Sequence, residues 1–244
     1  MTGGMIKWNK HAGENADEGN LVSNSALLSR VVGTANRFVS RMSVLQSQAE
    51  HKGVRAMGVM KLAVLFPGIG YHCDKPLLYY AAKLAKAAKY EVLPVSYTGF
   101  PEKVRGNADK MRECLDIAWS QANELLESVD WSVYNNILFI GKSIGTIVGS
   151  SFAEQRGLAV HSILLTPLAE TFRSVSGDAV AFHGTADPWA ETDAIVEACR
   201  ERGIPLYQTE GANHSLETGD VRRDVDILKD TIQKIEAFIR KINT

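Results

Sequence analysis

Short apolar runs alternate with amphipathic stretches along the chain from residue 60 onward. The runs are rich in Val, Ile, Leu and Phe and lie between polar and Gly residues, which is typical of buried β-strands. They span 61–66, 91–97, 136–141, 161–166, 178–183 and 204–208. Most runs are followed by apolar residues at the spacing of one helical face, which predicts helices. These helices span about 76–89, 107–128, 144–155, 189–202 and 221–242. The alternation predicts an α/β domain with about six mostly parallel strands and helices on both faces.

Two of these helices carry further expectations. Pro76 suits the first turn of its helix, and Asp74 is expected to cap that helix. The last helix has a long apolar face, and we expect this face to pack against the sheet. Its positions are Val221, Val225, Leu228, Ile232, Ile235, Ile239 and Ile242.

The first 59 residues do not follow this pattern. Residues 1–20 are polar and Gly-rich, and residues 25–48 predict one amphipathic helix with Asn24 as its cap. Three roles stay open for this helix: packing on the core or over a site, contacting a membrane surface or a partner, and serving as a leader. The chain therefore divides into an extension, 1–59, and a domain, 60–244.

The run 136–140 leads directly into Gly141-Lys142-Ser143-Ile144-Gly145. A serine on a tight turn between a strand and a helix is the context of a nucleophile elbow, in which the hydroxyl projects from the sheet. The helix that follows, 144–155, would point its free N–H groups at negative charge forming near Ser143. The context favours a nucleophilic serine over an ordinary surface loop.

Two nucleotide-binding interpretations are weaker. Gly141-Lys142-Ser143 resembles the end of a phosphate-binding loop, but Asn136 stands where that loop needs its first glycine. Gly68 and Gly70 could begin a dinucleotide fingerprint, but Cys73 replaces its third glycine.

A nucleophilic serine needs a base and an acid that orients the base. Asp187 follows the run 178–183, and His214 follows the run 204–208. The carboxyl ends of parallel strands share one edge of a sheet, so these side chains and Ser143 can converge there. Read alone, Asp187 is a turn or capping residue and His214 is a loop histidine. His183 competes as the base, but its place at a strand end fits a buried, hydrogen-bonded neighbour better.

From about residue 60 to residue 244 the chain resembles the α/β-hydrolase superfamily. The segments that carry the resemblance are 141–145, 183–187 and 211–214. The resemblance implies an α/β-hydrolase fold with Ser143 as nucleophile, Asp187 as triad acid and His214 as triad base.

The resemblance also implies an oxyanion hole made of two backbone N–H groups. Ile144 follows the nucleophile, and Ile69 lies in the glycine-containing loop after the run 61–66. The superfamily often has His-Gly where this chain has Pro67-Gly68, which leaves the loop donor open between Ile69 and Gly70.

Larger relatives insert a lid where only residues 167–177 connect two runs here, so we expect an open site without a large cap. Position alone suggests substrate-binding walls, with scaffold packing as an equal alternative. The wall candidates are Tyr71, Leu168, Phe172, Trp189 and Leu216. Lys142 and His72 are expected to be exposed and solvated.

Composition fits a single enzyme domain. The formal net charge is −1, which indicates neither nucleic acid nor a strongly charged partner. Three scattered cysteines suit a reduced, cytoplasmic protein. We expect no cofactor and no metal, because no cluster has metal-ligand spacing, and no membrane span, because no apolar run is long enough. The oligomeric state stays open.

The sequence therefore predicts a serine hydrolase that cleaves a carboxylic ester or thioester of a small soluble substrate through a Ser-Asp-His triad and an acyl-enzyme. A peptidase or amidase of the same fold is one alternative. A catalytically silent binding or scaffold protein that kept the triad is another, because the fold does not fix function.

Overall fold

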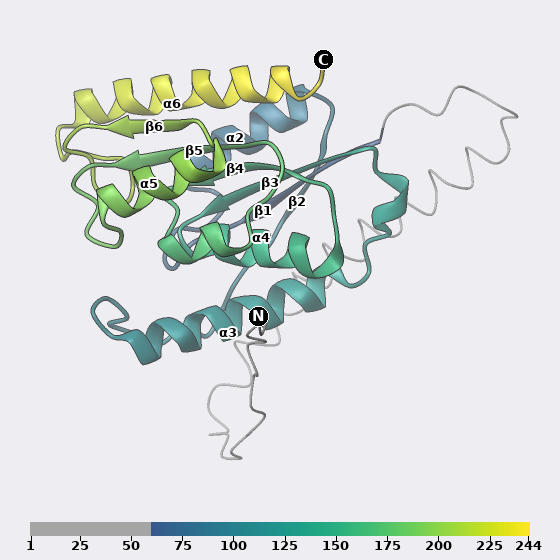
Figure 1. Ribbon diagram of the computed structural model, residues 1–244, viewed down its shortest axis with the longest axis horizontal. Coiled ribbons are helices and arrows are strands. Elements are labelled where there is room, and N and C mark those ends of the chain that lie inside the picture. Colours follow the sequence, from purple (N-terminus) through teal and green to yellow (C-terminus); the bar gives the residue numbers. More distant parts are fainter. Residues whose placement is uncertain (1–59) are drawn as a thin grey trace, which may run out of the picture. The chain divides into compact units, whose positions relative to one another are not determined.

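A parallel six-stranded sheet organises the protein (Figure 1). The computed structural model describes residues 60–244, so the predicted helix at 25–48 and the rest of the 1–59 extension lie outside the described residues. The strands are β1 (Lys61–Phe66), β2 (Glu91–Pro94), β3 (Asn136–Lys142), β4 (His161–Leu165), β5 (Ala179–Gly184) and β6 (Leu206–Thr209). They lie in the order β2-β1-β3-β4-β5-β6, and every neighbouring pair is parallel. The predicted fold class is confirmed.

β1 and β3 mark the point where the chain changes direction across the sheet. From β1 the chain moves outward to β2, and after returning to β3 it moves to the other edge through β4, β5 and β6. In open parallel sheets, ligands bind beyond the carboxyl ends of the strands at such a switch point, because the connecting loops part there. The loop after β1 and the turn after β3 both emerge at this point.

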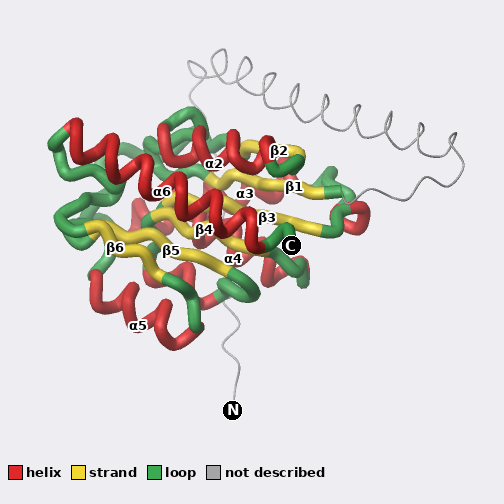
Figure 2. Tube along the Cα trace, turned by 90° about the horizontal axis from the view of Figure 1, so that it is seen from above, coloured by secondary structure: helices red, strands yellow, loops and turns green. Residues whose placement is uncertain are grey.

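Helices cover both faces of the sheet (Figures 1 and 2). One face carries α2 (Pro76–Ala87) and α6 (Val221–Lys241), and the other carries α3 (Ala108–Leu126), α4 (Ile144–Arg156) and α5 (Thr192–Arg202). The inner strands are therefore buried on both sides, which explains why β1 is a continuous apolar run instead of an alternating one. Its residues Leu62 to Phe66 are at most 1% exposed.

The helix starts show which local sequence signals operate. Asn107 accepts a hydrogen bond from the Lys110 N–H at 3.0 Å and so caps α3. The expected cap of α2 by Asp74 is wrong: Lys75 occupies the capping position and makes no side-chain cap bond. The Lys75 N–H bonds to the His72 carbonyl at 3.1 Å, so Asp74 lies inside a turn that precedes the helix.

α6 shows how far a periodic apolar face predicts burial. Ile235 and Ile239 are at most 2% exposed and pack in the core cluster with the sheet and α2. Val221 and Val225, by contrast, are 76% and 60% exposed, so the expectation that they pack on the sheet is wrong. Periodicity shows which side of a helix would be buried, but it does not show how much of the helix length meets the sheet.

Several other element boundaries differ from the sequence prediction, and the largest differences are at β2 and α5. β2 ends at Pro94, earlier than the predicted 97, and the Val95 N–H makes a last bond to the Leu65 carbonyl at 2.9 Å. α5 begins at Thr192 and not at 189. Both differences fall at element ends, where local propensity is the weakest guide.

The connection between β4 and β5 is short. It holds only a 3₁₀ turn, η3 (Ala169–Arg173), in which Phe172 is 3% exposed. The predicted absence of a large cap at this place is confirmed. Within residues 60–244, no helix combines the length and the apolar character that crossing a membrane requires.

Candidate active site

Ser143 sits on a strained turn between β3 and α4. Its φ of 57° and ψ of −126° lie in a region that L-residues rarely adopt. The turn is held by the Ser143 carbonyl, which accepts the Thr146 N–H at 2.9 Å and the Thr146 hydroxyl at 2.6 Å. The Ser143 N–H donates to the Leu165 carbonyl of β4 at 3.0 Å. The strain therefore falls on the serine, and hydrogen bonds to β4 and to the first turn of α4 hold its backbone in place.

The two glycines of the elbow are needed for space. Neither Gly141 nor Gly145 has a positive φ. A Cβ on Gly145 would lie 2.1 Å from the Phe66 carbonyl oxygen, and one on Gly141 would lie 2.7 Å from the Thr146 Cα. These glycines let α4 press directly against the ends of β1 and β3.

His214 bridges Ser143 and Asp187. Its Nε2 lies 2.8 Å from the Ser143 Oγ, and its Nδ1 lies 2.7 Å from Asp187 Oδ2. An ionised carboxylate only accepts hydrogen bonds, so the proton of the neutral imidazole belongs on Nδ1. Nε2 is then free to accept the Ser143 hydroxyl proton. The structure thus brings the three predicted residues into one hydrogen-bonded chain from three separate strand ends.

Asp187 is held in a fixed orientation after β5. Its side chain is fully buried, its Oδ1 accepts the Trp189 N–H at 2.8 Å, and its own N–H donates to the Gly184 carbonyl at 3.0 Å. His183 Nδ1 lies 4.0 Å from Asp187 Oδ2. His183 is itself fully buried, and its Nε2 is 2.9 Å from the Thr192 hydroxyl. As expected, His183 is a buried hydrogen-bonded neighbour, whereas His214 contacts the serine.

The His214 loop closes tightly on β5. A Cβ on Gly184 would lie 2.3 Å from the Ala212 carbonyl oxygen. Within the loop, the Asn213 N–H donates to the Glu217 carbonyl at 2.8 Å, and the Asn213 side chain accepts the Ser215 N–H at 2.7 Å. The close contact with β5 and the hydrogen bonds within the loop hold the His214 imidazole in position.

The surroundings of His214 favour its neutral form. Burial lowers the pKa of His214 below its ordinary value of 6.5, and the positive charge of Lys142 lowers this pKa further. The hydrogen bond to Asp187 opposes both effects, because it favours the charged ring. A general base must be neutral to accept a proton, so the net direction suits a base.

The loop after β1 and the start of α4 both offer N–H groups near Ser143. Gly68 and Tyr71 use their own N–H groups in a reciprocal pair with distances of 3.1 and 3.2 Å. Within residues 60–244, the N–H groups of Ile69, Gly70 and Ile144 have no acceptor. Ile144 opens α4, where backbone N–H groups lack intrahelical partners. The choice of loop donor between Ile69 and Gly70 stays open.

Comparison with solved structures identifies the architecture. Est1E from Butyrivibrio proteoclasticus superimposes with a TM-score of 0.55 at 12% identity over 75% of this chain and 88% of Est1E. The Pyrococcus furiosus esterase Pf2001 gives 0.54 at 12% identity over 76% and 84% of the two chains. The described domain has the α/β-hydrolase fold.

A third similar structure also lacks a lid over its hydrolase fold. An α/β serine hydrolase without a lid, from Xanthomonas campestris, gives a TM-score of 0.50 at 15% identity over 77% of this chain and 85% of its own. No protein-family model matches the sequence, and no curated protein matches it. At such identities the likeness concerns the fold, so the site must be argued from its own geometry.

One expectation about the elbow of the hydrolase-fold domain is wrong. Lys142 was expected to be solvated, but it is 1% exposed. His72 is exposed as expected, with 67% of its side chain accessible. Lys142 packs beside the loop after β1, where its Nζ lies 5.0 Å from the ring centroid of Tyr71, and no pattern within the elbow predicts this contact between distant segments.

The predicted wall residues occupy different environments. Tyr71, Leu168 and Leu216 are 7%, 6% and 2% exposed, and Tyr71 and Leu216 pack in the core cluster beneath α2 and α6. Trp189 is partly exposed, and its ring centroid lies 5.7 Å from that of His214. Phe172, the fifth candidate, is 3% exposed. Trp189 is therefore the candidate whose ring lies next to His214 of the triad, and a substrate-binding role for any of the five stays a prediction.

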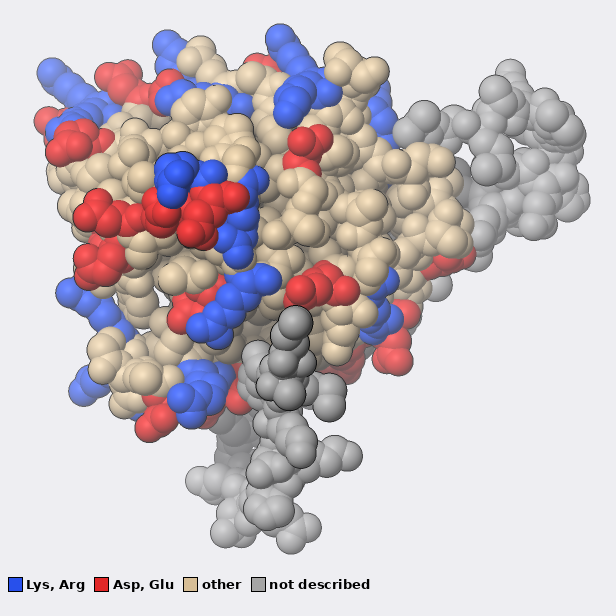
Figure 3. Space-filling view, in the orientation of Figure 1, with Lys and Arg blue, Asp and Glu red and all other residues tan. Residues whose placement is uncertain are grey.

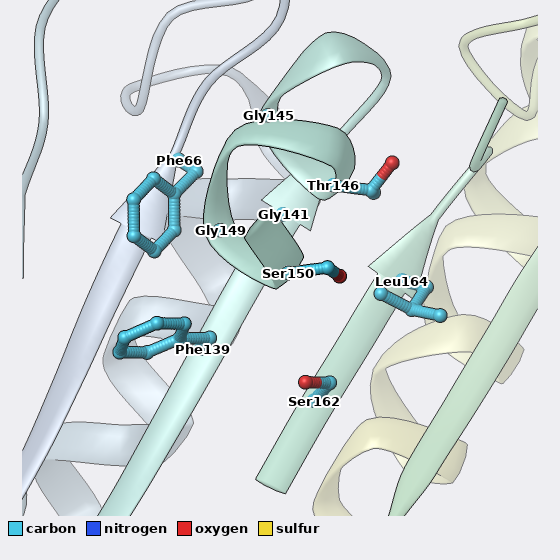
Figure 4. A pocket seen from close by; sticks show the side chains of 9 residues that line it. All are labelled: Phe66, Phe139, Gly141, Gly145, Thr146, Gly149, Ser150, Ser162 and Leu164. Atoms are coloured by element: carbon cyan, nitrogen blue, oxygen red, sulfur yellow. The ribbon is translucent and has the colours of Figure 1, made fainter. Parts of the chain in front are cut away.

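A small cavity lies beneath the elbow on the α4 side of the sheet (Figure 4). Its volume is about 10 Å³, which takes at most one water molecule. The lining residues are Phe66, Phe139, Gly141, Gly145, Thr146, Gly149, Ser150, Ser162 and Leu164. It is too small for a substrate and belongs to the packing of α4 against the sheet.

The described part of the face in Figure 3 shows no dominance of one charge. Lys and Arg side chains intermingle with Asp and Glu side chains over the described part of the face in Figure 3. This mixture agrees with the near-zero net charge.

Proposed function

We propose that this protein is a serine hydrolase that cleaves a carboxylic ester or thioester of a small-molecule substrate. The observation that supports the proposal most is the continuous hydrogen-bonded chain from Ser143 through His214 to the buried Asp187, at 2.8 and 2.7 Å. A silent scaffold does not need a neutral imidazole aimed at a strained serine. The predicted cytoplasmic location stays a prediction.

The geometry allows a two-stage reaction. Ser143 Oγ attacks the acyl carbon while His214 Nε2 takes its proton, and the electron pair of the carbonyl moves onto oxygen. The N–H of Ile144, with that of Ile69 or Gly70, would stabilise this oxyanion. The intermediate then collapses, and His214 returns the proton to the departing alcohol or thiol.

The second stage repeats the first with water as the nucleophile. His214 removes a proton from water, which attacks the acyl-serine, and the proton then returns to Ser143 Oγ as the acid is released. Asp187 holds the ring in position and stabilises its positive charge in both stages. Nothing in these steps distinguishes an ester from a thioester, so the leaving group must be found by experiment.

The deciding experiment combines labelling with turnover. The full-length protein should react with a fluorophosphonate at Ser143, located by mass spectrometry, and should hydrolyse members of a panel of p-nitrophenyl and thioester substrates of graded acyl length. An amide panel run in parallel tests the peptidase or amidase alternative. If the folded protein neither reacts with the fluorophosphonate nor hydrolyses any substrate, the scaffold alternative takes its place.

The rate should rise with pH through a midpoint below about 6.5. The pKa of His214 is lowered from its ordinary value mainly by burial, so the neutral base persists to lower pH than in an exposed histidine. The measurement is kcat/KM for one ester at constant ionic strength, with circular dichroism checking the fold at each pH. A midpoint above the ordinary histidine value would contradict this assignment.

Asp187→Asn should lower kcat by about 10²- to 10⁴-fold. The asparagine can donate from its NH₂ group to His214 Nδ1, which favours the imidazole tautomer with the proton on Nε2. In that tautomer, Nε2 cannot accept the hydroxyl proton of Ser143. Asp193→Asn on the exposed side of α5 is the matched control and should leave kcat unchanged. Equal activity in the two variants would remove Asp187 from the mechanism.

A further inference from the structure

Lys142 is a buried lysine directly before the proposed nucleophile. It is 1% exposed and ranks among the largest fully buried side chains of the described domain. It ends β3 on the same sheet face as Leu138 and Ile140, both of which belong to the core cluster beneath α2 and α6. The pattern of the strand therefore places a charged residue where an apolar one is expected.

Among the described residues, the ammonium of Lys142 has no ion-pair partner. Within residues 60–244, no carboxylate lies within 4 Å of its nitrogen and no group accepts a hydrogen bond from it; instead, Nζ lies 5.0 Å from the ring centroid of Tyr71. Tyr71 closes the loop that contains Ile69, and a Cβ on Gly68 in the same loop would lie 3.6 Å from Lys142 Cγ. The side chain thus runs alongside the proposed oxyanion loop.

The charged groups around Lys142 come from the loops that form the site. Asp187, from the loop after β5, and Glu217, from the loop before α6, favour its ammonium form, but burial is the larger influence and lowers the pKa of Lys142 to about 7. Lys142 in turn lowers the pKa of His214. The other ionisable groups here are His183, beside Asp187, and the Tyr71 phenol, whose pKa burial raises to about 12.

A purely structural role does not require this residue. A methionine would fill nearly the same volume without the cost of removing a charge from water. An unpaired buried amine beside a reactive serine is therefore a candidate for a functional group.

We propose that the Lys142 ammonium is a positioning residue of this active site: it keeps His214 neutral and adds positive potential along the oxyanion loop, which stabilises the charge that forms on the acyl oxygen. The inference rests on the proposed function of Ser143. The positive charge of Lys142 acts on His214 and on the oxyanion loop through its electrostatic potential. Lys142 does not itself exchange a proton with the substrate.

The proposal predicts a bell-shaped pH dependence. Activity needs neutral His214, which gives the acid limb, and charged Lys142, which gives an alkaline limb near pH 7. The two groups interact, so the limbs report the pair and not either residue alone. A wild-type kcat/KM that stays level from about pH 7 to 9 would overturn the proposal without any variant.

Lys142→Met tests the charge while keeping the volume. We expect the maximal kcat/KM to fall about tenfold, the acid limb to move up by about 0.5 to 1 pH unit, and the alkaline limb to disappear. The acid limb moves up because a positive neighbour that disfavours the imidazolium has been removed. The urea midpoint of unfolding should stay equal or rise, because a buried charge has been removed.

Lys83→Met is the matched control. The Lys83 nitrogen also lies over a tyrosine, 5.1 Å from the Tyr79 ring centroid, but both residues are exposed on α2. This variant should keep the wild-type pH profile. If Lys142→Met also keeps both limbs and their midpoints, Lys142 is a packing residue and the inference fails. If wild type shows neither fluorophosphonate labelling nor turnover, the proposed function fails instead.

Discussion

Ser143→Ala should abolish ester hydrolysis while leaving the fold intact. The substitution removes the attacking oxygen, so only the oxyanion donors and substrate binding remain, and kcat should fall on the order of 10³-fold or more. The lost hydroxyl donates to His214 and is not a packing group, so the free energy of unfolding should change by no more than about 1 kcal/mol. Initial rates with the best ester and urea unfolding measure the two effects.

The control for this variant removes a hydroxyl elsewhere. Ser128→Ala deletes an exposed hydroxyl at the end of α3 and should keep wild-type rates and labelling. His214→Ala should cost a factor comparable to Ser143→Ala, and the double variant little more, because the residues act as one unit. Wild-type turnover in Ser143→Ala would show that a different group performs the chemistry.

Gly145→Ala should destabilise the protein by about 3 kcal/mol or more. The added methyl would lie 2.1 Å from the Phe66 carbonyl oxygen and 2.6 Å from the Pro67 carbonyl oxygen. Both contacts are backbone atoms, so either α4 or the end of β1 must move. That movement would also displace the N–H of Ile144 from the loop that contains Ile69, so folded protein should retain little turnover.

Gly149→Ala, one turn further along α4, provides the comparison. Its methyl would lie 3.0 Å from the Phe66 ring, which can shift because it is a side chain. Alanine also favours the helix by about 1 kcal/mol over glycine, so the net change should stay within about 1 kcal/mol. The measurement is urea unfolding of both variants. Equal losses of stability would show that the contact with the β1 backbone does not limit the position of α4.

The sequence predicted which three side chains come together better than it predicted the residues and backbone around them. Ser143, Asp187 and His214 were predicted to converge because each follows a strand of a parallel sheet, and in the structure His214 lies between the other two, within hydrogen-bonding distance of both. Their catalytic roles stay predictions. Within the elbow, Ser143 itself takes the strained backbone conformation, and Gly141 and Gly145 provide room for neighbouring backbone.

By itself, the sequence determined that about six strands form a mostly parallel sheet and which three strand ends carry the candidate site residues. These features depend on hydrophobic patterns and on connections that are short in sequence, so local reasoning reaches them. Only the tertiary structure decided that Val221 and Val225 are exposed and that Lys142 is buried. Whether a helix end meets the sheet, or whether the loop 67–71 packs against a lysine, depends on contacts between segments that are distant in sequence, and the residues next to each position do not predict those contacts.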